Sequence, residues 1–265
     1  MERDRYLEAE YYDSEYYFQD DVNLFLRMAG EIPGEVLELA CGTGRIVIPF
    51  AQAGYKITGS DISQEMLAKA QEKIDKLPRE VKKRITLLQK DMRSFRLPKR
   101  FQLIILAFNS LLLATTPEEQ KIVISHAYRH LAPGGRLFVC AINPNREWFR
   151  EHVSTVKYYG TWIYQTTGKL FDRFYSNSND SLHKLMTFSL FYDHINEDKS
   201  VKREKNPIML RYLFSFELQY LLEQAGFVIT RLYGNYDEDS FSPQSPLMIF
   251  EALKKIPPTR IKSKK

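Results

Sequence analysis

The sequence has little cysteine: Cys41 and Cys140 are its only two, and each lies within an apolar run typical of a buried strand or strand end. Two cysteines so placed form neither a disulfide framework nor the spacing of a zinc site, as is usual in a reducing cytoplasm. His126 and His130, four residues apart on an expected helix, have no evident acidic or cysteine partner nearby. We therefore predict no metal site.

Long apolar runs are also absent. No stretch approaches the roughly 20 consecutive apolar residues that span a bilayer. Residues 1–21 are acidic and rich in tyrosine, unlike a signal peptide. We therefore expect a soluble, cytoplasmic protein that does not associate with membranes.

The body of the chain lacks an excess of positive charge. The formal net charge is +5, but residues 254–265 carry six Lys or Arg and no acid, which leaves −1 for the rest. The basicity belongs to a proline-containing tail that we expect to be disordered. Nucleic acid is therefore not the favoured partner, although a noncatalytic nucleic-acid-binding protein that uses this tail stays an alternative.

The sequence does contain, from about residue 36 to 143, an alternation of short apolar runs with segments of helical period, which is typical of repeated βαβ units. Strands are expected at 36–41, 56–61, 85–91, 101–107 and 136–143. Helices are expected at 45–53, 63–76 and 117–131. Ser63 can cap the second helix, and Thr116 with Glu119 forms a capping box for the third.

After residue 143 the alternation stops, and strand-like patterns at 161–165 and 185–192 indicate an antiparallel insertion. Regular structure resumes at 211–215, followed by a helix at 216–225 and strands at 227–233 and 247–253. We predict an α/β fold with a Rossmann-like, mostly parallel seven-stranded sheet, helices on both faces and an antiparallel β insertion after strand five. The expected parts are an N-terminal helical flap (1–34), a core (35–144 and 207–253), the insertion (145–206) and the basic tail (254–265).

The insertion holds twelve aromatic residues. Such a segment suits an apolar lid over a small ligand or a cationic amine. Ordinary packing within a small sheet or a homodimer contact would explain the same composition. The residues on which this expectation rests include Trp148, Tyr158, Tyr159, Trp162, Tyr164, Phe171, Phe174 and Tyr175.

The strongest chemical signal is VLELACGTGR at 36–45, where a strand runs into a glycine turn and then a helix. Gly42 and Gly44 permit positive φ and close approach of the backbone to a ligand. Glu38, Asp61 and Asp91 lie on or at the ends of three successive strands. They therefore face the crevice where parallel sheets bind ligands.

Four segments in order resemble the motifs of class I S-adenosylmethionine-dependent methyltransferases. They are ELACGTG at 38–44, GSDISQEML at 59–67, QKDM at 89–92 and LAPGGR at 131–136. The resemblance implies S-adenosylmethionine as cofactor and direct displacement of its methyl group, a reaction that demands alignment more than a catalytic base. The region at 211–236 resembles small-molecule members, which implies an amine, sugar or hydroxyl acceptor without identifying it.

The resemblance also implies roles for matching residues. Gly42 and Gly44 would pass close to the methionine portion, and Glu38 would hold its amino group. Asp61 would bind both ribose hydroxyls, and Asp91 with the Met92 backbone would bind the adenine. Phe108 and Asn109 would lie beside the methionine. The remaining expected cofactor residues are Ala40, which stands where the family often has glycine, Arg45, Ile62 and Met66.

Relatives with a Tyr-Asp pair near the amino terminus fold that segment over the cofactor, and Tyr12 and Asp13 match this pair. The resemblance implies that Tyr12 positions the reactants near the methyl group. One further alternative remains, a nicotinamide-dependent oxidoreductase, because Gly42, Gly44 and an acid on the second strand also suit a dinucleotide. Against this alternative, Val47 stands where the dinucleotide-binding pattern has its third glycine, and Asp91 would have no role in binding a dinucleotide.

Overall fold

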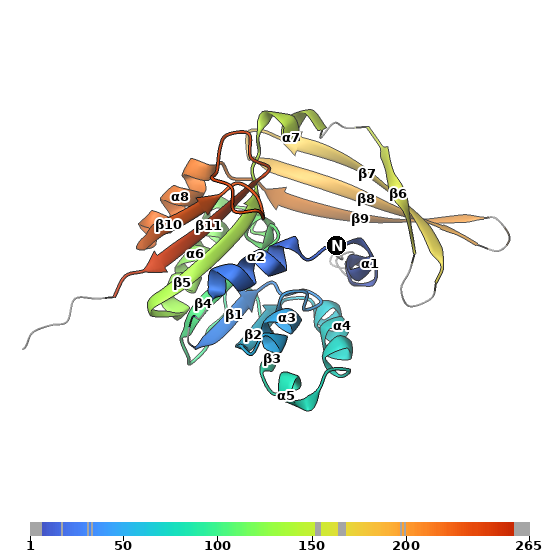
Figure 1. Ribbon diagram of the computed structural model, residues 1–265. Coiled ribbons are helices and arrows are strands. Elements are labelled where there is room, and N and C mark those ends of the chain that lie inside the picture. Colours follow the sequence, from blue (N-terminus) through green and yellow to red (C-terminus); the bar gives the residue numbers. More distant parts are fainter. Residues whose placement is uncertain are drawn as a thin grey trace, which may run out of the picture.

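The computed structural model describes residues 7–16, 18–30, 32, 34–151, 155–163, 168–196, 198 and 200–256. These residues form a seven-stranded sheet with helices on both faces and a four-stranded antiparallel sheet that lies over one end of it (Figure 1). The predicted fold class is confirmed. Within these ranges, no helix combines the length and the apolar character needed to cross a bilayer.

The large sheet has the strand order β10-β11-β5-β4-β1-β2-β3. Its strands are β1 (Glu35–Leu39), β2 (Lys56–Asp61), β3 (Ile85–Gln89), β4 (Phe101–Leu106), β5 (Leu131–Ile142), β10 (Phe227–Tyr233) and β11 (Leu247–Lys254). β1 pairs in parallel with both β2 and β4, so the chain order reverses at β1. Parallel sheets bind ligands outside the carboxyl ends of the strands at such a switch point.

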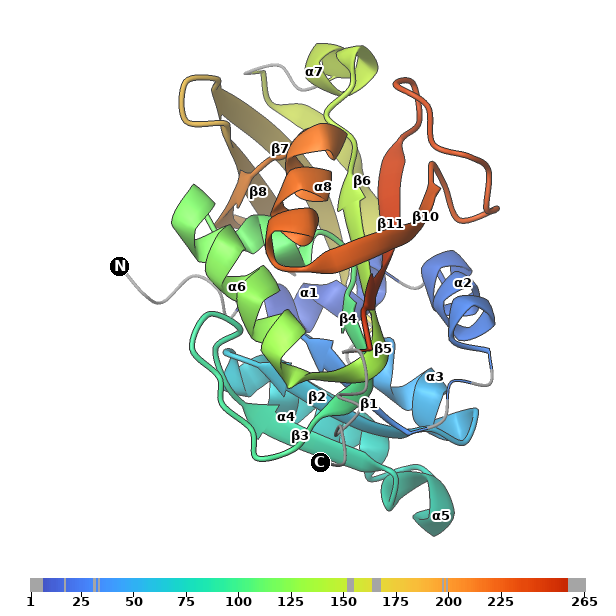
Figure 2. The same ribbon diagram turned by 90° about the vertical axis from the view of Figure 1, so that its left-hand side faces the viewer.

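Both faces of this sheet are covered, and neighbouring residues of one strand serve different cores. Leu37 and Leu39 of β1 belong to a core shared with α6 (Pro117–His130) and α8 (Ser215–Gln224). Val36 belongs to a core shared with α2 (Asp20–Ala29) and α3 (Val47–Gln52). Alternate strand residues face opposite sides, and Figure 2 shows these two helix pairs on opposite sides of the sheet.

The predicted helix caps are present with one difference. Ser63 precedes α4 (Gln64–Ile74), and its Oγ accepts from the Met66 N–H at 3.2 Å. Thr116 Oγ1 accepts from the Glu119 N–H at 3.1 Å. The reciprocal bond of the box reaches one residue further back, because the Glu119 carboxylate accepts from the N–H of Thr115 at 2.9 Å. Three short helices were not predicted, namely α5 (Arg79–Lys82), α7 (Arg146–Glu151) and the 3-10 helix η1 (Ser110–Leu113).

The insertion begins with α7 (Arg146–Glu151) and continues as β6 (Lys157–Ile163), β7 (Leu170–Asp180), β8 (Leu185–Ile195) and β9 (Val201–Arg211), paired in that order. The expected boundary at residue 206 falls inside β9, which pairs with β8 as far as Arg211. Pro207 obscured this strand in the sequence. Proline cannot donate to a sheet ladder, but it is tolerated in an edge strand such as β9.

The expected N-terminal flap contains two helices with different surroundings. α2 is built into the core through Val22, Phe25 and Met28. α1 (Leu7–Glu15) instead contacts α4 and β6, so it lies between the two sheets (Figure 1). Only α1 is therefore placed to cover a ligand at the strand ends.

Candidate active site

A cavity of about 770 Å³ lies between the carboxyl ends of the core strands, α1 and the four-stranded sheet. This volume is within the range of roughly 300–1,000 Å³ typical of small-molecule sites. Among the residues that line it are twelve of those expected from the sequence, namely Tyr12, Glu38, Ala40, Gly42, Arg45, Asp61, Ile62, Met66, Asp91, Met92, Phe108 and Asn109. Gly44 is not among the lining residues, because it packs against α4, where a Cβ would meet that of Ala70 at 3.4 Å.

Strained backbone gathers around this cavity. Gly42 has φ +51°, and a Cβ there would meet only Met66 Sδ, at 3.9 Å. Ala40, Phe108 and Asn109 also have positive φ, at +56°, +45° and +66°. Such non-glycine conformations cost on the order of 1–3 kcal/mol each and concentrate at functional sites. The left-handed backbone at Ala40 gives a physical reason for the glycine that the family often has there.

Glu38 is buried, with 4% of its surface exposed, and its Oε2 has no hydrogen-bond partner among the described residues. Burial raises the pKa of this carboxyl well above its ordinary value; Arg45 opposes the shift, and the charges of Asp21 and Asp61 add to it. A buried acceptor left unpaired is costly. The position therefore suits a ligand group that donates hydrogen bonds, such as an ammonium.

Asp61 closes the glycine turn at the end of β2. Its Oδ2 accepts from the Gly42 N–H at 2.8 Å, and its Oδ1 accepts from the Ser63 N–H at 2.9 Å. A carboxylate offers about four lone-pair sites. Both oxygens can therefore accept further bonds from hydroxyl donors while they hold the turn.

Arg45 makes contacts that the sequence did not predict. Its Nη1 and Nη2 each donate to Asp21 of α2 at 2.6 Å, and its guanidinium lies 4.9 Å from the ring centroid of Phe18 and 5.2 Å from that of Phe108. The Asp21 side chain is fully buried. Asp21 was missed because its partner lies 24 residues away, although an acid amid the apolar residues of a helix was a possible signal. This pair fixes the glycine turn to α2.

Asp91 is also engaged by an unexpected arginine. Arg93 donates from Nε at 3.0 Å and from Nη2 at 2.7 Å to Asp91, and from Nη1 to Glu119 at 2.6 Å. These bonds outweigh the partial burial of Arg93 and raise its pKa further above its ordinary value. Arg93 therefore holds the carboxylate in place at the expected adenine end of the cavity.

α1 presents different faces to the cavity and to the core. Tyr12 and Tyr16, one turn apart, line the cavity with their ring centroids 4.7 Å from each other. Asp13 lies between them in sequence and points to the glycine turn and α4, where it accepts from Thr43 Oγ1 at 2.6 Å and from Lys73 Nζ at 2.9 Å. The structure thus places Tyr12 at the cavity, while its expected nearness to a methyl group stays a prediction.

A third face of α1 binds the four-stranded sheet. Tyr11 stacks on Tyr192 with ring centroids 3.8 Å apart, and its hydroxyl lies 2.8 Å from His194 Nε2 and 2.8 Å from Glu204 Oε2. Glu15 forms a buried ion pair with Arg173 at 3.0 Å. α1 therefore joins the cofactor turn to the insertion.

The wall formed by the insertion differs from the aromatic lid that was expected. Of the eight aromatic residues singled out, only Trp148 is among the lining residues; Tyr164 lies outside the described residues. Tyr158 and Tyr159 are exposed, and Phe171 packs against Tyr11. The wall is built instead from Arg173 of β7 and from β8 and β9, whose lining residues are Phe188, Leu190, Asn206, Pro207, Ile208, Met209 and Leu210.

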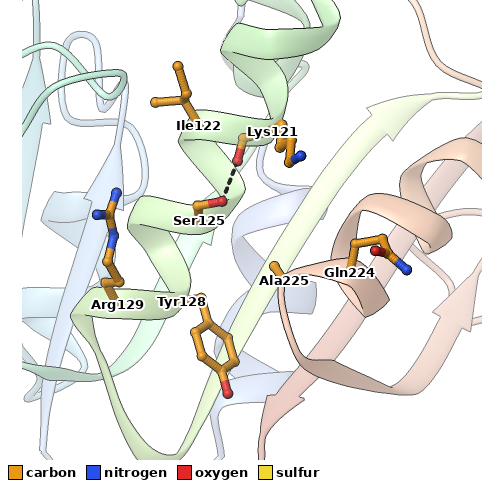
Figure 3. A pocket seen from close by; sticks show the side chains of 7 residues that line it. All are labelled: Lys121, Ile122, Ser125, Tyr128, Arg129, Gln224 and Ala225. Carbon is orange, nitrogen blue, oxygen red and sulfur yellow. Dashed lines mark hydrogen bonds between the residues drawn. The ribbon is translucent and has the colours of Figure 1, made fainter.

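A second pocket, of about 520 Å³, lies between α6 and the end of α8 (Figure 3). Its lining residues are Lys121, Ile122, Ser125, Tyr128, Arg129, Gln224 and Ala225. They include no carboxylate, no histidine and none of the motif residues. We therefore place the candidate active site in the larger cavity.

The chain is similar to known methyltransferases over the region that contains the motifs. Residues 36–135 match the family model of a methyltransferase domain, so the domain covers the glycine turn and all three strand-end acids. YqeM of Bacillus subtilis (strain 168), which carries the name of a methyltransferase, is 26% identical over 236 residues, covering 83% of this chain and 84% of YqeM.

Solved structures show that the whole fold recurs. An S-adenosylmethionine-dependent methyltransferase from Clostridium acetobutylicum is similar with a TM-score of 0.77 and 14% identity, over 95% of this chain and 97% of that one. CalS10, an amino pentose methyltransferase from Micromonospora echinaspora solved with its cofactor bound, is similar with a TM-score of 0.66 and 20% identity, over 89% of each chain. At these identities the likeness concerns the fold alone.

Proposed function

We propose that this chain, whose residues 36–135 match the family model of a methyltransferase domain, transfers the methyl group of S-adenosylmethionine directly to the nitrogen of a small-molecule amine. The amino pentose methyltransferase CalS10 makes amino sugars one candidate class. The observation that carries the choice of an amine is the distribution of ionisable groups around the cavity.

The described residues that line the cavity include three carboxylates, Glu38, Asp61 and Asp91, all at the strand ends where the motifs place the cofactor. The lining residues of β8 and β9 include no carboxylate and no histidine. An alcohol or phenol needs help to lose its proton, whereas a neutral amine already presents a lone pair and needs mainly alignment. This distribution supports N-methylation.

The residues at the strand ends fit the proposed cofactor. An ammonium would satisfy the unpaired buried oxygen of Glu38, and the Asp61 carboxylate at the glycine turn is an acceptor suited to hydroxyl donors. When bound, S-adenosylmethionine supplies an electrophilic methyl group on a positively charged sulfur. The rings of Tyr12, Tyr16 and Phe108 line the same cavity, where aromatic faces favour a cation and exclude water.

No observation favours the two alternatives. A nicotinamide-dependent oxidoreductase leaves Asp91 without a task, and the basic tail that a nucleic-acid-binding protein would use lies mostly outside the described residues. A metabolite-sized cavity enclosed by α1 and the insertion supports a small acceptor instead.

A methyl-transfer screen tests the proposal. The protein is incubated with methyl-labelled S-adenosylmethionine and amines, amino sugars, phenols, alcohols or RNA, with Asp61→Ala as the control for label that is not transferred by this site. We expect labelled product with amines. Transfer only to oxygen acceptors or to RNA would contradict the amine, and binding of NAD without S-adenosylmethionine in calorimetry would overturn the cofactor.

A further inference from the structure

The inner face of the four-stranded sheet combines an apolar surface with a few buried polar groups. Alternate residues share one face of a strand, and the lining residues include such a set: Arg173 of β7, Phe188 and Leu190 of β8, and Asn206, Ile208 and Leu210 of β9. In the ladder, Phe188 lies opposite Ile208, and Leu190 lies opposite Asn206. Arg173 and Asn206 are the polar members of this set.

Each of these two polar residues has one side-chain nitrogen without an acceptor, although Arg173 also bonds Glu15 and Tyr16 through its other nitrogens. Arg173 is 7% exposed and Asn206 is 1% exposed, and Arg173 Nε and Asn206 Nδ2 have no hydrogen-bond partner in the described part of the chain. Asn177, on the same face of β7 as Arg173, has an unpartnered Nδ2 as well. Buried donors normally have a hydrogen-bond partner, because leaving a buried donor unpaired costs more free energy than a formed hydrogen bond contributes to stability. A ligand that brings acceptor oxygens would complete this face.

Arg173 also has a counter-ion that can give up its charge. Glu15 of α1 lies 3.0 Å from Arg173, and the two side chains are 2% and 9% exposed. Burial raises the pKa of Glu15 to about 7, while Arg173 and a hydrogen bond with Tyr192 oppose the shift. Protonation of Glu15 would leave the guanidinium positive inside the protein, next to the cavity.

We propose that this face binds an oxyanion of the acceptor, a carboxylate or a phosphoryl group, through Arg173 and Asn206, while the apolar residues of β8 and β9 hold its carbon skeleton. The inference rests on the proposed function and narrows its substrate class to amines that carry an oxyanion. A guanidinium and amide donors match the acceptor oxygens of such a group. A cationic acceptor without an anion would meet the charge of Arg173 unfavourably.

Calorimetry on the full-length protein saturated with S-adenosylhomocysteine tests the inference. The probes are 4-aminobenzoate, 4-aminophenyl phosphate and the neutral 4-aminobenzamide, which share an aromatic amine and differ in the anionic group. We expect the wild type to bind at least one anionic probe about tenfold or more tightly than the amide, as charge-assisted hydrogen bonds of this kind allow. The carboxylate and phosphate arms show which oxyanion is preferred.

Variants then assign the preference to this face. Arg173→Gln should remove it while leaving the affinity for the amide unchanged, Arg173→Lys should retain part of it, and Glu15→Gln should increase it because the competing carboxylate is gone. The matched control is Arg203→Gln on β9, an exposed arginine paired with Asp193, which should leave all three affinities unchanged. Circular dichroism and the S-adenosylhomocysteine affinity of each variant show that it is folded.

The inference is overturned if the wild type does not prefer either anionic probe to the amide, or if Arg173→Gln keeps the preference. It is also overturned if Arg173→Gln mainly weakens S-adenosylhomocysteine, since Arg173 would then hold the cofactor carboxylate. Failure of the wild type to bind S-adenosylhomocysteine would count against the proposed function itself.

Discussion

The carboxylate of Asp13 accepts a hydrogen bond from the hydroxyl of Thr43 at 2.6 Å, across 30 positions of the chain. Thr43 is the residue between the two glycines of the motif, and it is fully buried. The contact therefore makes the shape of the glycine turn depend on the placement of α1. Lys73 of α4 donates to both oxygens of the same carboxylate at 2.9 Å and so helps to hold it in place.

Asp13→Ala should weaken S-adenosylhomocysteine binding by about 1–2 kcal/mol, because it unpairs Thr43 and releases α1 from the turn. Asp13→Asn, which can still accept from Thr43 but loses the ion pair with Lys73, should lose less. Titration calorimetry measures both. Equal affinity in the wild type and the alanine variant would separate α1 from cofactor binding.

Asp61→Ala should weaken cofactor binding by roughly 2–4 kcal/mol, since it removes the expected acceptors of two hydroxyls together with those of two backbone N–H groups. Asp61→Asn should lose less because one amide oxygen still accepts. Wild-type affinity in Asp61→Ala, measured by calorimetry, would show that the ribose assignment is wrong.

Ala40→Gly should stabilise the fold by about 0.5–1 kcal/mol. Glycine removes the steric strain of an alanine side chain at φ +56°, and this gain exceeds the cost of the greater conformational entropy that glycine gives the unfolded chain. Ala40→Val should destabilise it by about 2 kcal/mol or more, since β-branched residues fit this region poorly. The control is Ala70→Gly, a buried position inside α4, where the same change should destabilise. Urea denaturation gives the three values, and a destabilised Ala40→Gly would contradict the strain.

The wild type should lose stability relative to Glu15→Gln as the pH rises from about 4.5 to 7. The pKa of Glu15 is raised from 4.5 to about 7 by burial, so the folded state binds more protons than the unfolded state in this window. Stability is therefore greatest below the unfolded pKa and falls through the folded one, by about 3 kcal/mol at most. Denaturation at several pH values measures the difference, and a flat difference would contradict the raised pKa.

Tyr11→Ala and Tyr12→Ala should separate stability from function. Tyr11 is buried against Phe171 and Tyr192, so its truncation should cost about 3 kcal/mol and loosen the insertion. Tyr12 lines the cavity, so its truncation should reduce cofactor affinity and turnover with little change in the melting temperature. The reverse pattern would move the functional role from Tyr12 to Tyr11.

Deletion of residues 1–18 tests more than the expected flap. The deletion removes α1 and should loosen the insertion, because it uncovers the cluster of Phe171, Leu190 and Tyr192. Proteolysis of the truncated protein should cut within residues 155–211 before it cuts the core.

The core was predictable because its signals are local. β2 and β10 have the bounds that their apolar runs predicted, and the three acids lie in or within two residues of the short strands β1, β2 and β3. The insertion was less predictable. β7 and β9 are buried on one face only, so they have no continuous apolar run, and they carry polar residues as well as Pro207. These strands form because their backbones hydrogen-bond to β8, and this pairing cannot be read from the sequence.

The partners of the site residues were not predictable for a different reason. Asp21 pairs with Arg45, Glu119 with Arg93 and Glu15 with Arg173, and each pair joins elements that only the fold brings together. A sequence shows that a charge is present in an apolar segment, but the geometry of the ion pair arises from packing. The motif residues could be predicted because their spacing along the chain identifies them without knowledge of the fold.

The hydrogen bond between Tyr11 and Glu204 spans 193 positions, and this has a consequence for synthesis on the ribosome. α1 emerges long before β9, so the Tyr11 hydroxyl has no Glu204 partner until β9 has been made. At about 5–20 residues per second, the helix waits roughly 10–40 s for its partner strand. The cavity therefore closes late in the life of the nascent chain, and a chain released before residue 204 would carry the cofactor turn and the first helix without the wall that encloses a substrate.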